Sequence, residues 1–539
     1  MSRFDKSPLQ TAAAIGVGSR SGDFAASPPL AGELIGPEAC AVDRRDLDRI
    51  TTGGGAVLLA SVFGNGLSYL FGIYLARSLG SSDFGLYALG LTIFNMVTMV
   101  VLFGMDSAAT KYVSEHLARG DRNAAHRTLF HAVAISLSAS VIAAGCMAAA
   151  AGVVAQALYR RPELATVLLV LAAGVPFAVL SATMIPGLQA FQSVRATILI
   201  RYLWEPVGKF LLVGIALYVG FGLPLVIAAL VCAWIVGSML AVWFWQRLFP
   251  ISSLHSVGWD WAVVAQLTSY CLPLSLATLF GVIAPRGDIL LLGYWSSAQQ
   301  VGVYQAAFQT ASALGLILAA LDVAIAPVVG RAWAAGDAAK LRATYRLAVR
   351  LSATVAVPLF LIMLLFSSEI LGMFGDEFQP GAGALVLLAI GQLANCIAGS
   401  TNTVLLMTGR SRLVMINTIV FGILLFGLTA LLVPLTGIEG AAVAAAGSLV
   451  ALNVTRAIQV WKLLRVSSVT MDLLKPIAAG SLVAAMILLL RRPDASGSLL
   501  LAFLGCGLYL ACLITLGLPD EEKSLLGRLC PWWRSNPWA

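Results

Sequence analysis

The feature that most constrains this chain is a succession of apolar stretches, each about 20 residues long, that begins near Gly53 and continues almost to the C-terminus. A helix of about 20 apolar residues crosses ~30 Å of hydrocarbon, because each residue adds about 1.5 Å. Charged residues make up only 11% of the chain and hydrophobic residues 59%, whereas a soluble domain carries about 25% charged residues. The sequence therefore predicts an all-α polytopic membrane protein.

Fourteen stretches are long enough to be transmembrane helices. We number the predicted helices 1 to 14, and their ranges are 53–79, 84–108, 128–156, 164–188, 195–219, 222–246, 264–293, 299–326, 341–366, 382–407, 412–435, 438–462, 470–490 and 497–518. The first 50 residues differ from these, since they are rich in Ser, Gly, Pro and mixed charge. That composition predicts a disordered tail.

One sequence module occurs twice in the chain, from Ser81 to Asp121 and from Ser296 to Asp337. The matching pairs are Gly85 with Gly302, Tyr87 with Tyr304, Asp106 with Asp322, Gly120 with Gly336, and Asp121 with Asp337. Internal repeats of this kind build many membrane transporters, and the substrate path lies between the repeated halves. The chain is therefore predicted to consist of two homologous halves.

The basic residues predict the orientation of the helices. The loops between helices 2 and 3, 8 and 9, 10 and 11, and 12 and 13 hold most of the Lys and Arg, and the loop between helices 9 and 10 is acidic. Positive charge is retained on the cytoplasmic side, so we expect both termini to be cytoplasmic. The net charge of +8 follows largely from this asymmetry. It does not indicate a nucleic-acid interface, because no basic cluster is interleaved with exposed aromatic residues.

Enzyme and cofactor signatures are missing from the sequence. The chain has no Walker A loop, GxSxG elbow, HExxH motif or dinucleotide-binding glycine loop. The eight cysteines are scattered without a CxxC pair, which predicts neither a disulfide framework nor a metal site. We expect a protein that is not an enzyme and that holds no cofactor.

The clearest candidate site is in helix 5, where Arg201, Glu205 and Lys209 recur at every fourth position. In a straight α-helix this spacing places all three on one stripe through the middle of the membrane. Charges at that depth cost about 2.5 to 3.5 kcal/mol each and mark functional positions. The stripe predicts the lining of a hydrated, anion-attracting cavity. An internal ion ladder, in which Glu205 pairs with both neighbours, is the structural alternative.

Three further charges lie within predicted helices. Helix 7 carries Arg286 and Asp288 just after a proline, and helix 9 carries Arg350 two turns inside the membrane. Proline frees backbone carbonyls that a polar cavity can satisfy. A substrate contact and a structural Arg286–Asp288 pair are both compatible with this pattern.

The duplicated pair Asp106 and Asp322 precedes the cytoplasmic ends of helices 2 and 8. Its functional interpretation is a symmetric gate that closes the cytoplasmic side against basic loops. A helix break or cap is the structural interpretation, since Gly104 stands beside Asp106 and Pro327 follows Asp322.

Several motifs resemble those of a known family. They are the run from Leu75 to Leu89 (LARSLGSSDFGLYAL), the run from Ala109 to Asp121 (ATKYVSEHLARGD), the run DILLLGY from Asp288, and VGVY ending at Tyr304. Together with the helix layout over residues 50 to 520, they resemble Wzx-type polysaccharide flippases of the multidrug/oligosaccharidyl-lipid/polysaccharide (MOP) exporter superfamily.

The resemblance implies a MATE-like fold with two pseudo-symmetric six-helix bundles and two additional C-terminal helices. The implied divisions are a cytoplasmic tail (1–50), a first bundle (51–247), a cytoplasmic linker (248–263), a second bundle (264–465), two additional helices (466–519) and a cytoplasmic tail (520–539).

It also implies a function, namely the transfer of an undecaprenyl-diphosphate-linked oligosaccharide across the bacterial inner membrane for exopolysaccharide, O-antigen or capsule synthesis. Arg201, Lys209, Arg286 and Arg350 would line a cationic groove for the diphosphate, and one half would rock against the other. Glu205 or Asp288 could couple transport to protons or sodium. A polysaccharide polymerase and a chain-length regulator are the implied protein partners.

Three alternatives stay open. A MATE-like drug or cation antiporter shares the architecture, although the basic bias of helix 5 argues against it. A lipid II flippase would also use a cationic cavity. A membrane scaffold that transports nothing would have no need of charge inside the bilayer.

Overall fold

The computed structural model describes residues 44–191, 194–220, 222–248, 258–283, 286–465 and 474–490, with several positions between 504 and 515. The predicted N-terminal tail up to residue 43, the C-terminal tail, much of the linker and most of the fourteenth predicted helix lie outside these residues. Residues from Gly55 onward form one compact unit. Met1–Gly54 forms a separate unit, of which only the start of the first helix is described.

Within the described residues, all regular structure is helical. The first half contains α1 (Arg44–Leu102), α2 (Met105–Ala118), α3 (Arg122–Val153), α4 (Glu163–Ala190), α5 (Val194–Thr197), α6 (Glu205–Val219) and α7 (Gly222–Leu248), with π-helical turns at Val154–Leu158 and Ile198–Trp204. The second half contains α8 (Trp261–Ile283), α9 (Gly287–Trp295), α10 (Ala298–Ala334), α11 (Ala338–Leu365), α12 (Ser367–Gly372), a 3₁₀ turn (Asp376–Gly381), α13 (Ala382–Ala398), α14 (Thr401–Met407), α15 (Ser411–Thr436) and α16 (Ile438–Leu464). The additional helix α17 spans Leu474–Leu490.

The helices confirm a polytopic membrane fold. Ten described helical segments are long and apolar enough to cross a membrane. The first of them, Phe63–Ala118, joins predicted helices 1 and 2, which are separated by a non-helical residue, Gly80, with φ 76° and ψ 172°. Predicted helices 7 and 13 correspond to shorter apolar segments, Trp261–Leu272 and Lys475–Leu489. The count of fourteen stays a prediction.

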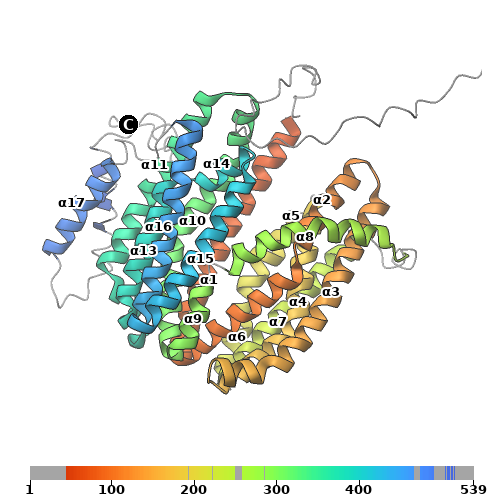
Figure 1. The fold of residues 1–539 in the computed structure, drawn as a ribbon, viewed down its shortest axis with the longest axis horizontal. Coiled ribbons are helices and arrows are strands. Elements are labelled where there is room, and N and C mark those ends of the chain that lie inside the picture. Colours follow the sequence, from red (N-terminus) through yellow and green to blue (C-terminus); the bar gives the residue numbers. More distant parts are fainter. Residues whose placement is uncertain are drawn as a thin grey trace, which may run out of the picture. The chain divides into compact units, whose positions relative to one another are not determined.

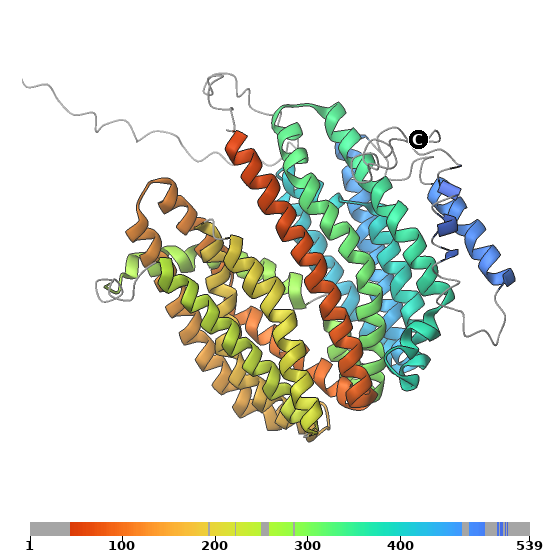
Figure 2. The same ribbon diagram turned by 180° about the vertical axis from the view of Figure 1, so that it is seen from behind.

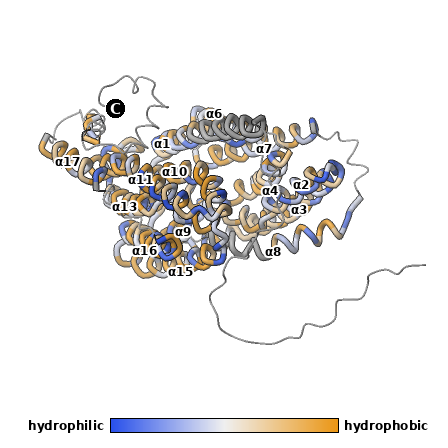
Figure 3. The backbone as a smooth tube through the Cα atoms, turned by 90° about the horizontal axis from the view of Figure 1, so that it is seen from above, coloured by the Kyte–Doolittle hydropathy of each residue, from blue (hydrophilic) through white to orange (hydrophobic). Residues whose placement is uncertain are grey.

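Large apolar side chains point outward from these helices, as lipid requires. Ile142, Leu435 and Ile423 are 68%, 73% and 65% exposed, and hydrophobic residues dominate the length of most helices (Figure 3). In water an apolar surface of this kind would favour aggregation, whereas in a bilayer it faces apolar hydrocarbon. The short helix α2 is more hydrophilic (Figure 3).

The helices pack as two groups. In the first half, α4 packs against α2, α3 and α7, while in the second half α13 packs against α10, α11 and α16 and α15 packs against α16 (Figure 1). The middle of α1, before Gly80, also contacts the second group, because the Tyr69 hydroxyl lies 3.1 Å from the Thr310 hydroxyl of α10; Figure 2 shows α1 from behind. The predicted pair of bundles is therefore present, and α1 links them.

The repeated Gly-Asp pairs are turns that start equivalent helices. Gly120 and Gly336 have φ of +78° and +68°, a conformation that glycine adopts without strain. The following Asp121 and Asp337 each accept a 2.9 Å hydrogen bond from a backbone N–H three residues on, at the starts of α3 and α11. The duplication is thus structural here, since the same N-cap is used twice.

The other duplicated acidic pair has diverged. The helix preceding Asp106 ends at Leu102, the chain turns through Phe103 and Gly104 with positive φ, and Asp106 lies in the first turn of α2. The corresponding helix, α10, continues past Asp322 and Pro327 to Ala334. The expected helix break therefore occurs at Asp106 and is wrong for Asp322, because α10 accommodates Pro327 inside its length.

Candidate functional site

The two halves meet where the duplicated glycines cross. A Cβ atom placed on Gly85 would lie 1.9 Å from the carbonyl oxygen of Ala298, and a Cβ atom on Gly302 would lie 2.0 Å from the carbonyl oxygen of Ser81. Each glycine therefore contacts the backbone four residues before its counterpart in the other half. We call this contact the crossing. Its reciprocity places a pseudo-twofold axis between Gly85 and Gly302.

Two polar contacts flank the crossing and join the halves. The Glu377 carboxylate of the second half accepts hydrogen bonds from the backbone N–H of Ser81, at 3.2 Å, and from the Ser81 hydroxyl. The Arg161 guanidinium of the first half donates to the backbone carbonyl of Ser296. We call these two contacts the latches. Arg161 lies in a loop, where burial lowers the pKa of its guanidinium and the Glu163 carboxylate opposes that shift.

The helix 5 residues form a pair and a separate cation. Lys209 Nζ lies 2.7 Å from Glu205 Oε1 and 5.9 Å from the centre of the Trp234 ring. Arg201 is exposed and lies in the π-helical turn Ile198–Trp204. A π-helix needs more residues per turn than an α-helix, so four residues do not bring Arg201 onto the face of Glu205. The straight stripe holds from Glu205 to Lys209 only.

Arg286 and Asp288 each have a different neighbour. Asp288 is 1% exposed and accepts hydrogen bonds from the Tyr304 hydroxyl and from the backbone N–H of Ile289 at 2.8 Å. The Arg286 guanidinium lies 4.8 Å from the centre of the Phe308 ring, in cation–π range. Tyr304 belongs to the duplicated module, so this module supplies the donor that holds a buried carboxylate.

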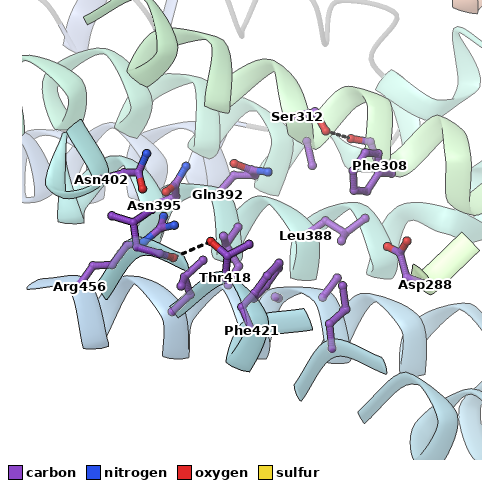
Figure 4. Close-up of a pocket in the computed structure, with 17 residues that line it drawn as sticks. Asp288, Phe308, Ser312, Leu388, Gln392, Asn395, Asn402, Thr418, Phe421 and Arg456 are labelled. Carbon is purple, nitrogen blue, oxygen red and sulfur yellow. Dashed lines mark hydrogen bonds between the residues drawn. The ribbon is translucent and has the colours of Figure 1, made fainter. Parts of the chain in front are cut away.

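A chamber lies inside the second half. A cavity of about 430 Å³ runs between α9, α10, α13, α15 and α16, and a second cavity of about 220 Å³ shares Asn395, Asn402 and Arg456 with it. Figure 4 shows the larger cavity with Asp288 at one end and a group of polar side chains at the other. We call the two cavities together the second-half chamber, and its residues Asp322, Gln392, Asn395, Asn402, Asn453 and Arg456 the polar end.

The polar end holds hydrogen-bonding atoms that have no partner. Asp322 Oδ1, Asn402 Oδ1 and Arg456 Nε are buried without a hydrogen bond. Asp322 acts electrostatically on Arg456, although no ion pair joins them within 4.0 Å. Buried polar atoms of native proteins are normally satisfied by protein, water or ligand. The polar end is therefore suited to receive a polar molecule.

Sequence reasoning reached only part of this chamber. Asp288 and Asp322 were expected at functional positions and both line it, whereas Arg350 of α11 is absent from the described lining of either cavity. Arg456 was missed. The available signal was an arginine 18 residues into a membrane-spanning helix, with Asn453 one turn before it.

A metal site has no support in the described residues, among which no group of three or more His, Cys, Asp or Glu side chains could hold an ion.

Two membrane-embedded halves related by a pseudo-twofold axis, with a polar chamber inside the second half, make up the fold of this chain, and solved MATE and MurJ structures share that fold. The comparisons give the family. Residues 74–382, more than half of the chain, match the model of the polysaccharide biosynthesis protein family, and the chain belongs to that family.

A curated relative is the probable low-salt glycan biosynthesis flippase Agl15 of Haloferax volcanii, which is 25% identical over 397 residues, or 72% of this chain and 79% of the relative. Among solved structures, the lipid II flippase MurJ in an inward closed conformation matches with a TM-score of 0.69 at 13% identity, over 84% of this chain and 97% of that chain. An inward-facing MATE multidrug transporter matches with a TM-score of 0.61 at 17% identity, over 76% and 98%. The expected family relationship is confirmed: the family model identifies a polysaccharide biosynthesis protein, and the fold is shared with the MurJ flippase and a MATE transporter.

Proposed function

We propose that this protein moves a polyprenyl-diphosphate-linked oligosaccharide from the cytoplasmic to the outer leaflet of a bacterial inner membrane, where it serves polysaccharide synthesis. The observation that carries the proposal is the second-half chamber. It places charges of both signs and several amides among helices that are otherwise apolar enough to span a membrane. The glycan part of this lipid cannot cross hydrocarbon unaided, because its polar groups would lose their hydrogen bonds to water. Polar side chains that face a cavity can replace those hydrogen bonds.

The proposed orientation follows from the basic loops. With cytoplasmic termini, the crossing and the latches lie at the outer end, and the polar end of the chamber lies toward the cytoplasm. A substrate then enters from the cytoplasm while the outer end is held shut. Transport requires the crossing to separate as the two halves rock. The diphosphate stays with the cationic side chains, for which Arg201, Lys209, Arg286 and Arg350 are our candidates.

Glycan rather than drug transport is favoured by the kind of polar group in the chamber. Amides and an arginine donate hydrogen bonds to hydroxyl and phosphate oxygens, whereas a cationic drug requires acidic or aromatic groups without a competing cation. The proteins named above include flippases as well as a multidrug transporter, so this preference rests on Arg456 and its neighbours.

The test uses the purified full-length chain in proteoliposomes that contain a fluorescent polyprenyl-diphosphate oligosaccharide. We expect the protein to make lipid on the protected side accessible to a glycosidase that cannot enter the vesicle. Cysteines at Glu163 and Gln299, exposed on the two halves beside the crossing, allow a cleavable cross-linker to hold the halves together. Cross-linking should stop transfer and cleavage should restore it.

A reagent that modifies the same cysteines without joining them is the matched control, and it should leave transfer unchanged. Transfer at the rate of protein-free vesicles would overturn the proposal, as would undiminished transfer by the cross-linked protein. Transfer of cationic drugs or of lipid II in place of the oligosaccharide would support the corresponding rival.

A further inference from the structure

The polar end of the second-half chamber has the composition of a site for one particular kind of molecule. Resting on the function proposed above, we propose that it is a subsite for an uncharged sugar ring of the transported glycan, and that the balance between Asp322 and Arg456 selects neutral sugars over acidic ones.

The charges at the polar end balance each other. One carboxylate and one guanidinium line the same cavity of about 220 Å³ without forming an ion pair. A free cation placed there would be repelled by Arg456, and a free anion would be repelled by Asp322. A neutral molecule with hydroxyl groups meets neither penalty, since it can donate to the carboxylate and accept from the guanidinium.

The polar end also offers both hydrogen-bond donors and hydrogen-bond acceptors. Asp322 Oδ1 and Asn402 Oδ1 are free acceptors and Arg456 Nε is a free donor, all three shielded from solvent. The amide groups of Asn395 and Asn453 offer both roles. Sugar hydroxyls are also donors and acceptors at once, and adjacent hydroxyls on a ring match a donor and an acceptor held side by side. Leaving such atoms unpaired is unfavourable, and the hydroxyl groups of a bound sugar would pair with them.

The volume and the apolar lining of the chamber also suit a sugar ring. The adjoining cavity of about 430 Å³ lies within the range of about 300 to 1,000 Å³ that is usual for small-molecule sites. Beyond the polar end it is lined by Leu388, Phe421 and Phe308 (Figure 4). Apolar and aromatic walls suit the C–H faces of a sugar ring, so the chamber offers a polar edge and an apolar face to the same molecule.

The experiment measures binding of three lipids to the full-length protein by native mass spectrometry. The probes are polyprenyl diphosphate without sugar, the same lipid carrying one glucose, and the same lipid carrying one glucuronic acid. We expect the wild-type protein to bind the glucose lipid about tenfold more tightly than the other two. This corresponds to ~1.4 kcal/mol, or one to two net hydrogen bonds.

Two substitutions should change the preference in opposite directions. D322N leaves Arg456 uncompensated, so the glucuronic acid lipid should become the preferred ligand. R456Q leaves Asp322 uncompensated and should reject the glucuronic acid lipid more strongly than wild type. K462Q is the matched control, because Lys462 is exposed on the same helix, α16, and its loss removes one positive charge outside the chamber. It should leave the preference unchanged.

Ratios between lipids are independent of how much protein folds, so partial misfolding does not imitate the expected result. Equal binding of all three lipids by wild type and both variants would overturn the sugar subsite while leaving the flippase proposal intact. Failure of the wild type to bind any of the diphosphate lipids would instead overturn the flippase proposal.

Discussion

The crossing makes a quantitative prediction about a single methyl group. Gly85→Ala would place a Cβ atom 1.9 Å from the carbonyl oxygen of Ala298, and ordinary contact begins near 3.4 Å, so the two helices must separate locally by about 1.5 Å. The obstacle is backbone, which cannot rotate away as a flexible side chain can. The substitution therefore strains the state in which the two halves meet at the crossing.

The magnitude follows from the cost of overpacking, which is ~1 to 3 kcal/mol for one methyl group in a well-packed interior. A state with a separated crossing escapes this strain. Since 1.4 kcal/mol corresponds to a factor of ten, the ratio of separated to closed molecules should rise about 5- to 150-fold. Gly302→Ala should act similarly, because its Cβ atom would lie 2.0 Å from the Ser81 carbonyl.

Pulsed electron spin resonance between labels at Glu163 and Gln299, in a variant without native cysteines, measures the separation directly. Wild type should give one short-distance population, and Gly85→Ala should add a longer one. Gly427→Ala is the matched control, since this glycine of α15 has open space where a Cβ atom would lie. An unchanged distance distribution in well-inserted Gly85→Ala protein would refute the tight crossing.

Three further predictions concern polar contacts. Arg161→Gln replaces the guanidinium of one latch with a shorter, uncharged side chain and should raise the separated population in the same spin-resonance assay. A separated population equal to that of wild type would show that this latch does not hold the two halves together. Tyr304→Phe leaves buried Asp288 without its hydroxyl donor and should lower the free energy of unfolding by ~1 to 3 kcal/mol, so an unchanged thermal midpoint in detergent would contradict the contact. Exchanging the charges of Glu205 and Lys209 preserves their ion pair; transport should nevertheless fall if the lysine attracts anions, and full activity would favour the ion ladder.

The sequence predicted the membrane fold because apolar length is a local property that needs no knowledge of contacts. Ranges of about 20 apolar residues matched described helices, and the repeated module predicted a duplication that the crossing confirms through Gly85 and Gly302. Breaks were harder to predict. Gly80 and Gly104 interrupt helices at positive φ, whereas Pro327 lies inside α10 without ending it, since packing decides whether a proline is accommodated.

The candidate site was less predictable, for two physical reasons. The helix 5 stripe assumed 100° per residue, and the π-helical turn that contains Arg201 has a different period for which the sequence carries no local signal. The polar end of the chamber is assembled from α10, α13, α14 and α16, whose members Asp322, Asn395 and Arg456 are separated by more than 60 residues in the chain. Only packing brings such residues together.

Asymmetry within the duplicated frame shows how the chemistry of the two halves diverged. At the latches, Arg161 faces the carbonyl that follows the C-terminal end of α9, while Glu377 faces an N–H at the start of a helix. A cation suits the negative end of a helix dipole and a carboxylate suits the positive end, so equivalent loops acquired opposite charges.

The same divergence concentrates polar chemistry in the second half. Asp322 has a duplicated counterpart in Asp106, but α7, the counterpart of α16, carries its only charge at Arg247 in the last turn, where a long side chain reaches the headgroups. A charge-balanced polar end could therefore develop only where Arg456 and Asp322 line the same cavity. If that balance selects the sugar, specificity evolves through substitutions in α10 and α16 while the glycine crossing stays fixed, because the crossing depends on backbone contact and the chamber depends on side chains.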